Sequence, residues 1–315
     1  MEQQHKPVPT DAVSGPPAIG LLSITELLKH HAQTRGQKLA FSGPDRAISY
    51  ADLAARTGRI ASHLAGAGLR HGDRMAIVLS NCVEMAEGIL AIVRAGAIGV
   101  PLDPRSSLVE LTAVLAHSKA CMILTDSRRL GKVRGAVSER TTIVVITSEK
   151  ENVSGDGEGL LEYEDLAERD AARAPPDDLG PSEPAWLHYT SGTTGDRKGV
   201  LSSQQAWLLA AYNSLPEYSM TSADHMFWPL PLFHSFGHGG CIIPTVAMGA
   251  SAHFPGDVPL LDSLLSQPDV TTIAGVGSDF PRAPSHGPSR CPTASPPTVA
   301  LHRWGTRCGE TLCPD

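Results

Sequence analysis

Hydrophobic and polar positions alternate along the first half of the chain with two different periods. Short apolar runs such as Met75–Leu79 and Cys121–Thr125 have the length of buried strands. Residues 51–67 instead place leucine, isoleucine and alanine at helical spacing and end near a pair of glycines. Strands that alternate with helices predict a layered α/β sheet. The predicted strands are 39–41, 75–79, 98–101 and 121–125, and the predicted helices are 51–67, 83–95 and 108–117.

The pattern pauses and then resumes in the second half. Residues 149–184 are rich in Glu, Asp, Gly and Pro around one short amphipathic piece, and predict an exposed connection. Further strands are predicted at 185–189, 226–228, 250–254 and 270–274, with helices at 204–215 and 239–248. We therefore expect a flexible N-terminus (1–20), a first α/β subdomain (21–148), the connection (149–184) and a second α/β subdomain (185–280).

The last part of the chain loses both periods. Residues 281–315 hold seven of the 25 prolines and three of the six cysteines, without apolar periodicity. We expect an irregular tail that is non-native or disordered. A frameshifted terminus is one explanation that fits its composition.

Composition narrows the class of partner. The formal charge is −7, and no long run of Lys and Arg occurs, which argues against nucleic acid or an anionic membrane surface. The N-terminal residues lack the apolar stretch of a signal peptide, and no apolar run reaches the length of a membrane span. We therefore expect a cytoplasmic protein with free thiols. The sequence contains no CxxC pair that would suggest a zinc site. Because the charge argues against nucleic acid and membranes, small molecules are the expected partners.

The richest candidate chemistry lies in residues 189–200, YTSGTTGDRKGV. Hydroxyl groups, glycines and an ammonium group are what an anion cradle needs, because glycines let successive N–H groups face one side. A Walker A loop is rejected because Lys198 is followed by Gly199 and the glycine spacing is wrong. A polar surface turn is the remaining alternative. The candidate phosphate-binding residues are Thr190, Ser191, Gly192, Thr193, Thr194, Gly195 and Lys198.

This loop resembles that of the adenylate-forming superfamily of acyl-CoA synthetases, nonribosomal peptide adenylation domains and luciferases, which reads close to YTSGTTGxPKG. Arg197 replaces the usual proline. ISYADL at 48–53 and VRAGAIGVPLDP at 93–104 agree with other family segments, so the resemblance covers about residues 20–280. It implies the layered α/β sheets of the family's large N-terminal domain, truncated, with the small C-terminal domain absent.

A second landmark is PLPLFHSFGHGG at 229–240. By resemblance, His234 borders the acyl pocket and the nucleotide phosphate, where an imidazole can orient a carboxylate. The alternative is a hydrogen-bonded loop histidine. His238 invites a metal site shared with His234, but the glycines around it and the lack of an HExxH pattern argue against one. The apolar stretch 242–248 is expected to be core.

The resemblance implies a reaction in which a carboxylic acid and ATP, with Mg²⁺, give an acyl adenylate and pyrophosphate. The acyl group then passes to the thiol of coenzyme A or of phosphopantetheine on an acyl carrier protein. The family's adenine-binding strand, ribose-binding TGD motif and catalytic lysine are not found, so we expect these 315 residues alone to be inactive. A loading domain of a polyketide synthase is one version of this prediction. A nucleotide- or acyl-binding remnant without catalysis is the alternative, and the acid itself is not specified.

Overall fold

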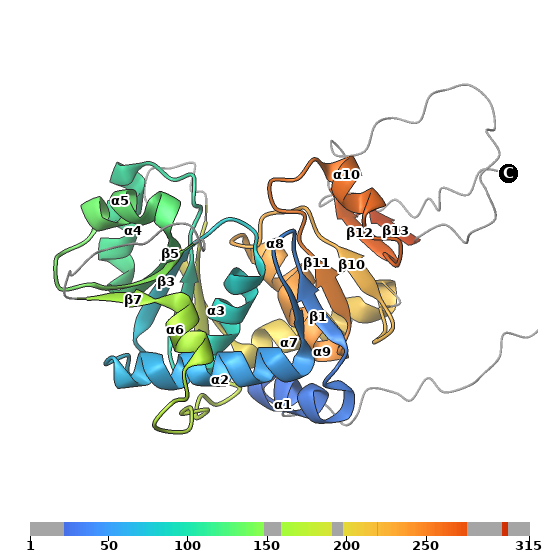
Figure 1. The fold of residues 1–315 in the computed structure, drawn as a ribbon, viewed down its shortest axis with the longest axis horizontal. Helices are drawn as coiled ribbons and strands as arrows, with labels where there is room; N and C mark the ends of the chain where they lie inside the picture. The colour runs from blue at the N-terminus through green and yellow to red at the C-terminus, as the bar shows by residue number, and fades with distance from the viewer. Residues whose placement is uncertain (1–21, 148–158, 191–197, 219, 276–297, 302–315) are drawn as a thin grey trace, which may run out of the picture.

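Two sheets of mostly parallel strands lie side by side in the computed structural model (Figure 1). The structure describes residues 22–147, 159–190, 198–218, 220–275 and 298–301. The helical elements are α1 (Ile24–Arg35), α2 (Tyr50–Gly66), α3 (Val83–Arg94), α4 (Leu108–Ser118), α5 (Ser127–Ala136), α6 (Tyr163–Glu168), α7 (Gln204–Tyr218), α8 (Ser235–Gly237), the π-helix η1 (His238–Ile242), α9 (Ile243–Met248) and α10 (Leu260–Leu265).

The strands follow the same alternation. They are β1 (Leu39–Ser42), β2 (Ala47–Ser49), β3 (Arg74–Val78), β4 (Ile98–Pro101), β5 (Ala120–Asp126), β6 (Thr142–Ile146), β7 (Leu160–Glu162), β8 (Pro184–Tyr189), β9 (Gly199–Ser203), β10 (His225–Phe227), β11 (Ser251–His253), β12 (Thr272–Gly275) and β13 (Thr298–Leu301). The strands and helices predicted between residues 39 and 125 are confirmed. So is the layered α/β fold.

The seven-stranded sheet has the order β7-β6-β5-β3-β4-β8-β9, with β9 alone antiparallel to its neighbour. Successive side chains of a strand point to opposite faces. In β3, Met75 and Ile77 accordingly join one buried cluster, while Ala76 and Val78 join another. The second cluster lies under α4 and α5, so this sheet is covered on both faces, as parallel sheets require.

The six-stranded sheet has the order β13-β12-β10-β11-β1-β2. Strand β1 lies parallel to β11, with Phe41 opposite Ala252, and β2 returns antiparallel beside β1. The first strands of the chain therefore complete a sheet built from its last described strands. Helix α3 contacts strands of both sheets, and α2 runs along the base of both (Figure 1).

The structure differs from the predicted division into consecutive subdomains. Strands β1 and β2 belong with β10–β13, whereas β8 and β9 belong with β3–β7. Which strands pair depends on contacts between residues that are distant in sequence. The order of strands along the chain therefore does not predict which sheet each strand joins. Residues 298–301, expected to be irregular, form β13 beside β12, and the other residues of that tail lie outside the described part.

The predicted exposed connection is also partly structured. Residues 160–168 form β7 and α6, and Tyr163 is buried, where its hydroxyl donates to Oε2 of Glu87 at 3.1 Å. Asp177 accepts from the buried Arg94 guanidinium at 2.8 Å. The prediction missed these anchors because polar residues are usually solvent-exposed, whereas here the Tyr163 hydroxyl and the Asp177 carboxylate bind buried polar groups. Across the described residues, no helix is long and apolar enough to cross a membrane.

Candidate active site

The segment predicted to bind phosphate begins and ends at the neck of an antiparallel hairpin. Strands β8 and β9 pair up to Tyr189 opposite Gly199, and the backbone N–H of Thr190 then donates to the carbonyl of Lys198 at 3.0 Å. A Cβ at Gly199 would stand 2.8 Å from Cδ1 of Leu187, so a larger residue there would require the Leu187 side chain to shift. The two ends of the loop are therefore fixed next to each other.

The structure describes two of the seven predicted phosphate-binding residues. Thr190 and Lys198 are both exposed, at the neck of the hairpin. Within the described ranges no carboxylate pairs with the Lys198 ammonium group, which suits it to an anionic ligand. The other five predicted residues, Ser191, Gly192, Thr193, Thr194 and Gly195, lie outside the described residues.

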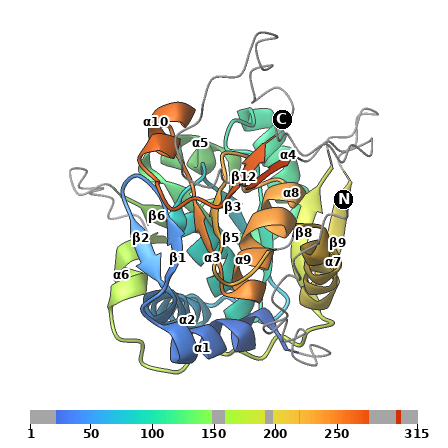
Figure 2. The same cartoon turned by 90° about the vertical axis from the view of Figure 1, so that its right-hand side faces the viewer.

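Strand β8 is tied to the neighbouring layer beside this neck. The hydroxyl of Tyr189 and Nδ1 of His117, the latter on α4, share a hydrogen bond of 2.8 Å, and the rings meet edge to face. Trp186, in the middle of β8, is fully buried, and its ring contacts that of His238 on η1. Figure 2 shows α7 lying along the β8–β9 hairpin. The two strands on either side of the predicted phosphate-binding segment are thus well anchored.

His234 lies at the start of a helical run in the other sheet's half. It is exposed and is the N-cap of α8, and its Nδ1 accepts from the backbone N–H of Phe236 at 3.2 Å. A ring nitrogen that accepts a hydrogen bond carries no proton, so the neutral imidazole holds its proton on Nε2. The free Nε2–H group can therefore donate to a carboxylate or phosphate oxygen.

A cluster of rings joins β8 to this helical run. His188 on β8 lies 5.1 Å from His238 on η1, measured between ring centroids, and Trp186 and Trp207 contact the same His238 ring at 4.4 and 5.2 Å. Burial lowers the pKa of His188 to about 4, and repulsion from a proton on nearby His234 would add to this effect. The cluster brings the loop-bearing strand and the His234 segment together.

His234 and His238 occupy different environments, which bears on the metal alternative. His238 is fully buried, and burial lowers its pKa well below the usual value, whereas His234 is exposed. The helix predicted over 239–248 is present as η1 followed by α9. The two glycines lie in this π-helical turn. At Gly239 the backbone packs directly on the Trp207 ring, so a side chain would not fit there. The apolar stretch 242–248 is core, as predicted.

Sequence reasoning missed three residues of this region. His188 and Trp207 position the helical run against β8, and Asn81 hydrogen-bonds the chain just before His234. Asn81 directly follows a buried strand, at the edge where functional groups of parallel sheets gather, and this position was the available signal. For the two aromatic side chains no pattern in the sequence distinguishes them from ordinary core.

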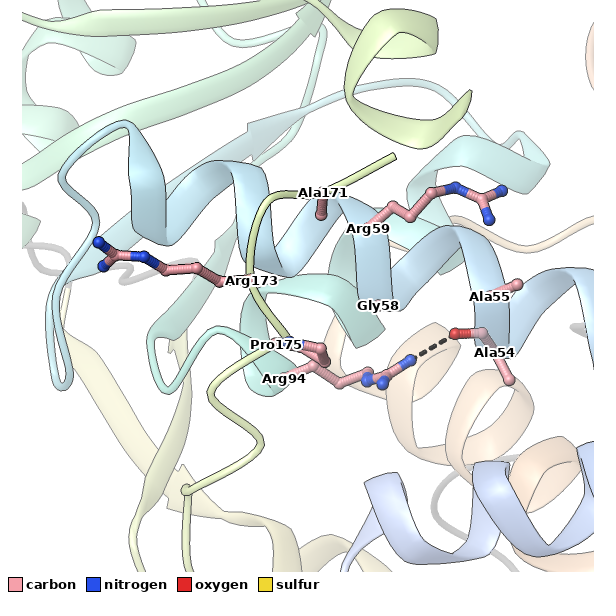
Figure 3. Close-up of a pocket in the computed structure, with 8 residues that line it drawn as sticks. All are labelled: Ala54, Ala55, Gly58, Arg59, Arg94, Ala171, Arg173 and Pro175. Carbon is pink, nitrogen blue, oxygen red and sulfur yellow. Dashed lines mark hydrogen bonds between the residues drawn. The ribbon is translucent and has the colours of Figure 1, made fainter. Parts of the chain in front are cut away.

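A second concavity lies away from this region. It is an open pocket of about 330 Å³ between α2 and the segment 171–175. Its best-placed cation, Arg94, is already paired with Asp177 and with backbone oxygen, while the Arg59 and Arg173 side chains extend away from the pocket (Figure 3). The charges that line it do not converge on one point, so we place no ligand there.

Comparison with known proteins settles the family. The family model described as AMP-binding enzyme matches residues 28–296. The chain belongs to this AMP-binding enzyme family. It is 43% identical over 300 residues to a naringenin synthase of Pestalotiopsis fici, covering 92% of this chain and 11% of that protein. It is 31% identical to an indoleacetate–CoA ligase of Aromatoleum aromaticum, covering 73% of this chain and 44% of the ligase.

Solved structures agree with the fold of this AMP-binding enzyme. ATP-bound MatB from Rhodopseudomonas palustris superposes with a TM-score of 0.68 and 27% identity, over 81% of this chain and 50% of MatB. The predicted family resemblance is thereby confirmed. The chain spans about a tenth of the naringenin synthase and about half of the other two proteins, so the activity of the whole protein is a matter for proposal.

Proposed function

We propose that this chain is part of a ligase that uses ATP to activate a carboxylic acid as its acyl adenylate. A carboxylate oxygen attacks the α-phosphorus, the bond to the β-phosphate oxygen breaks, and pyrophosphate leaves. The acyl group then passes to the thiol of coenzyme A or of a carrier protein, releasing AMP. Family membership and the exposed Lys198 at the neck of a hydroxyl-rich loop support this proposal.

The observation that carries the proposal is the junction between the loop neck and His234. Lys198 and Thr190 lie at the end of a hairpin of the seven-stranded sheet, and His234 lies at the start of the helical run beyond it. The contact between His188 and His238 joins the two. In the proposed reaction, Lys198 and the loop hydroxyl groups hold the β- and γ-phosphates. The Nε2–H group of His234 orients the carboxylate and offsets charge as it approaches phosphorus. Magnesium would supply further charge neutralisation on the phosphates.

An aromatic acid and a polyketide assembly are the proposed substrate class and setting. Naringenin synthase is the name of a relative 43% identical to this chain, and indoleacetate is the substrate named for another. The acyl acceptor would then be a phosphopantetheine thiol on a carrier protein, with coenzyme A as the other candidate.

ATP–pyrophosphate exchange by the full-length protein tests the reaction. We expect exchange with arylpropenoic or benzoic acids, weaker exchange with octanoic acid, and at least about tenfold less exchange in Lys198→Ala, because a charged phosphate contact is lost. Lys29→Ala is the control, because Lys29 lies on α1 and forms an ion pair with Asp177, outside the candidate site. Full exchange in Lys198→Ala would contradict the assigned role of the loop.

The alternative is a remnant that binds nucleotide without chemistry. Equilibrium binding of ATP to the 315-residue chain separates the two: we expect binding that Lys198→Ala weakens, without pyrophosphate release by this chain alone. Turnover by the 315 residues would contradict the expected inactivity. Binding by the full-length protein without exchange for any acid would favour the remnant.

A further inference from the structure

Asn81 makes a two-point contact with the chain segment that leads to His234. Its Nδ2 donates to the carbonyl of Leu230 at 2.7 Å, and its Oδ1 accepts from the backbone N–H of Leu232 at 2.8 Å. One planar amide therefore satisfies a backbone acceptor and a backbone donor two residues apart. Two hydrogen bonds from one rigid group fix both the position and the orientation of this segment.

The segment has few other tethers of this kind. Residues 229–233 connect β10 to α8 without regular secondary structure. The Arg105 guanidinium stands 5.8 Å from the ring centroid of Phe233, a surface contact of a side chain that is already paired with Asp103. Among the described residues, the only hydrogen bond found for the His234 ring is the one to its own helix, from Phe236. The backbone, rather than a side-chain partner, thus sets where the imidazole lies.

Asn81 itself belongs to the sheet that carries the phosphate loop. It follows β3, the strand between β5 and β4, and precedes α3, whose first residues are buried. Strands β8 and β9 lie in the same sheet, beyond β4. The reacting groups therefore come from two sheets, and Asn81 bridges them 151 residues away in sequence from Leu232. Misplacement of a reacting group by about 1 Å can cost about a hundredfold in rate.

We propose that Asn81 is a positioning residue that fixes His234 relative to the neck of the β8–β9 hairpin, where Thr190 and Lys198 lie; this inference rests on the proposed function. The amide holds the 230–232 backbone at the carboxyl edge of the seven-stranded sheet, and the imidazole follows. The role is distinct from general support of the fold, because it acts on the rate through one side chain.

A double-mutant cycle with the full-length protein tests this role, because coupled residues are non-additive. Asn81→Ala is expected to lower the turnover number of ATP–pyrophosphate exchange about ten- to a hundredfold, with the KM for ATP changed less than about threefold. In the His234→Ala background, the same change is expected to cost less than about twofold. Asn213→Ala, at an exposed position on α7, is the matched control and is expected to leave exchange unchanged.

Two results would overturn the inference. The first is an additive cycle, in which Asn81→Ala has its full effect without His234. The second is loss of ATP binding in both Asn81→Ala and Asn81→Asp, which would indicate a general role in folding. The aspartate variant keeps the acceptor for the Leu232 N–H group but places an oxygen against the Leu230 carbonyl. If the alanine variant unfolds, the aspartate variant replaces it in the double-mutant cycle. Unchanged exchange in His234→Ala would instead contradict the proposed function.

Discussion

His188 and His238 face each other in the core with ring centroids 5.1 Å apart, and in the described part of the chain neither ring has a hydrogen-bond partner. Two buried imidazoles of this kind are stable only as neutral rings, because a charged ring would be desolvated beside another basic ring. The same pair joins the strand that carries the phosphate loop to the helical run that carries His234. Protonation of these rings at low pH should therefore destabilise the contact between the two elements.

The first prediction concerns pH. The pKa of His188 is about 4 in the folded protein and about 6.5 in an unfolded chain, so the unfolded chain binds more protons below pH 6.5. Stability is then fully present above about pH 6.5 and falls as the pH drops toward 4, by at most on the order of 3 kcal/mol for this group. Urea unfolding from pH 7.5 to 4.5 measures it. His188→Phe, which keeps a ring, should show a shallower loss, and an identical pH profile would contradict the assignment.

The second prediction concerns Gly237, directly beyond α8's central residue. An added Cβ would lie 2.2 Å from the Pro231 carbonyl oxygen and 2.7 Å from Cα of Leu232. Gly237→Ala should therefore cost about 1–3 kcal/mol through overpacking. Gly66→Ala is the control, because nothing lies within 4 Å of its Cβ position at the end of α2. Alanine there should be neutral or stabilising. Equal unfolding free energies for the two variants would contradict the prediction.

The third prediction compares two carboxylates around one arginine. Glu87 is fully buried and accepts from Nε of Arg56 at 2.7 Å, whereas Glu168 is mostly exposed and lies 3.8 Å from the same guanidinium. Glu87→Ala should cost about 3 kcal/mol, because the largely buried Arg56 loses its buried partner and keeps only the more exposed Glu164 carboxylate at 3.0 Å. Glu168→Ala should cost less than about 1 kcal/mol. Chemical denaturation at neutral pH measures both. Similar losses in the two variants would contradict the prediction and mean that Glu164 and solvent, rather than Glu87, compensate the charge of Arg56.

The sequence supports prediction where the physics is local. Helix α2 was predicted from apolar residues at helical spacing, and strands β3 and β5 were predicted from short apolar runs. The structure adds that β3 buries alternate residues on two faces. Helix α1 was missed although Ser23 and Glu26 form a capping box, since the segment before it reads as loose and proline-rich. The exchange of β1 and β8 between sheets could not be predicted, because pairing partners are chosen over long sequence distances.

The candidate site divides in the same way. His234 and Lys198 carry chemistry that a motif displays directly. His188 and Asn81 act through geometry: one contacts a ring on another element, and the other satisfies two backbone groups of a distant loop. Such roles depend on where the two sheets meet, which is a property of the assembled fold. The phosphate-binding role of all seven predicted residues, and the role of His234, stay predictions.

The parallel pairing of β1 with β11 has a consequence for how the protein is made. Ser42 contacts His253, 211 residues later, so the N-terminal hairpin leaves the ribosome long before its neighbour in the sheet exists. A lone two-stranded hairpin is marginal in water. In the nascent chain, one edge of the β1–β2 hairpin therefore stays unpaired until β11 has been synthesised. Such long-range pairing slows folding and exposes the incomplete chain to chaperones and proteases.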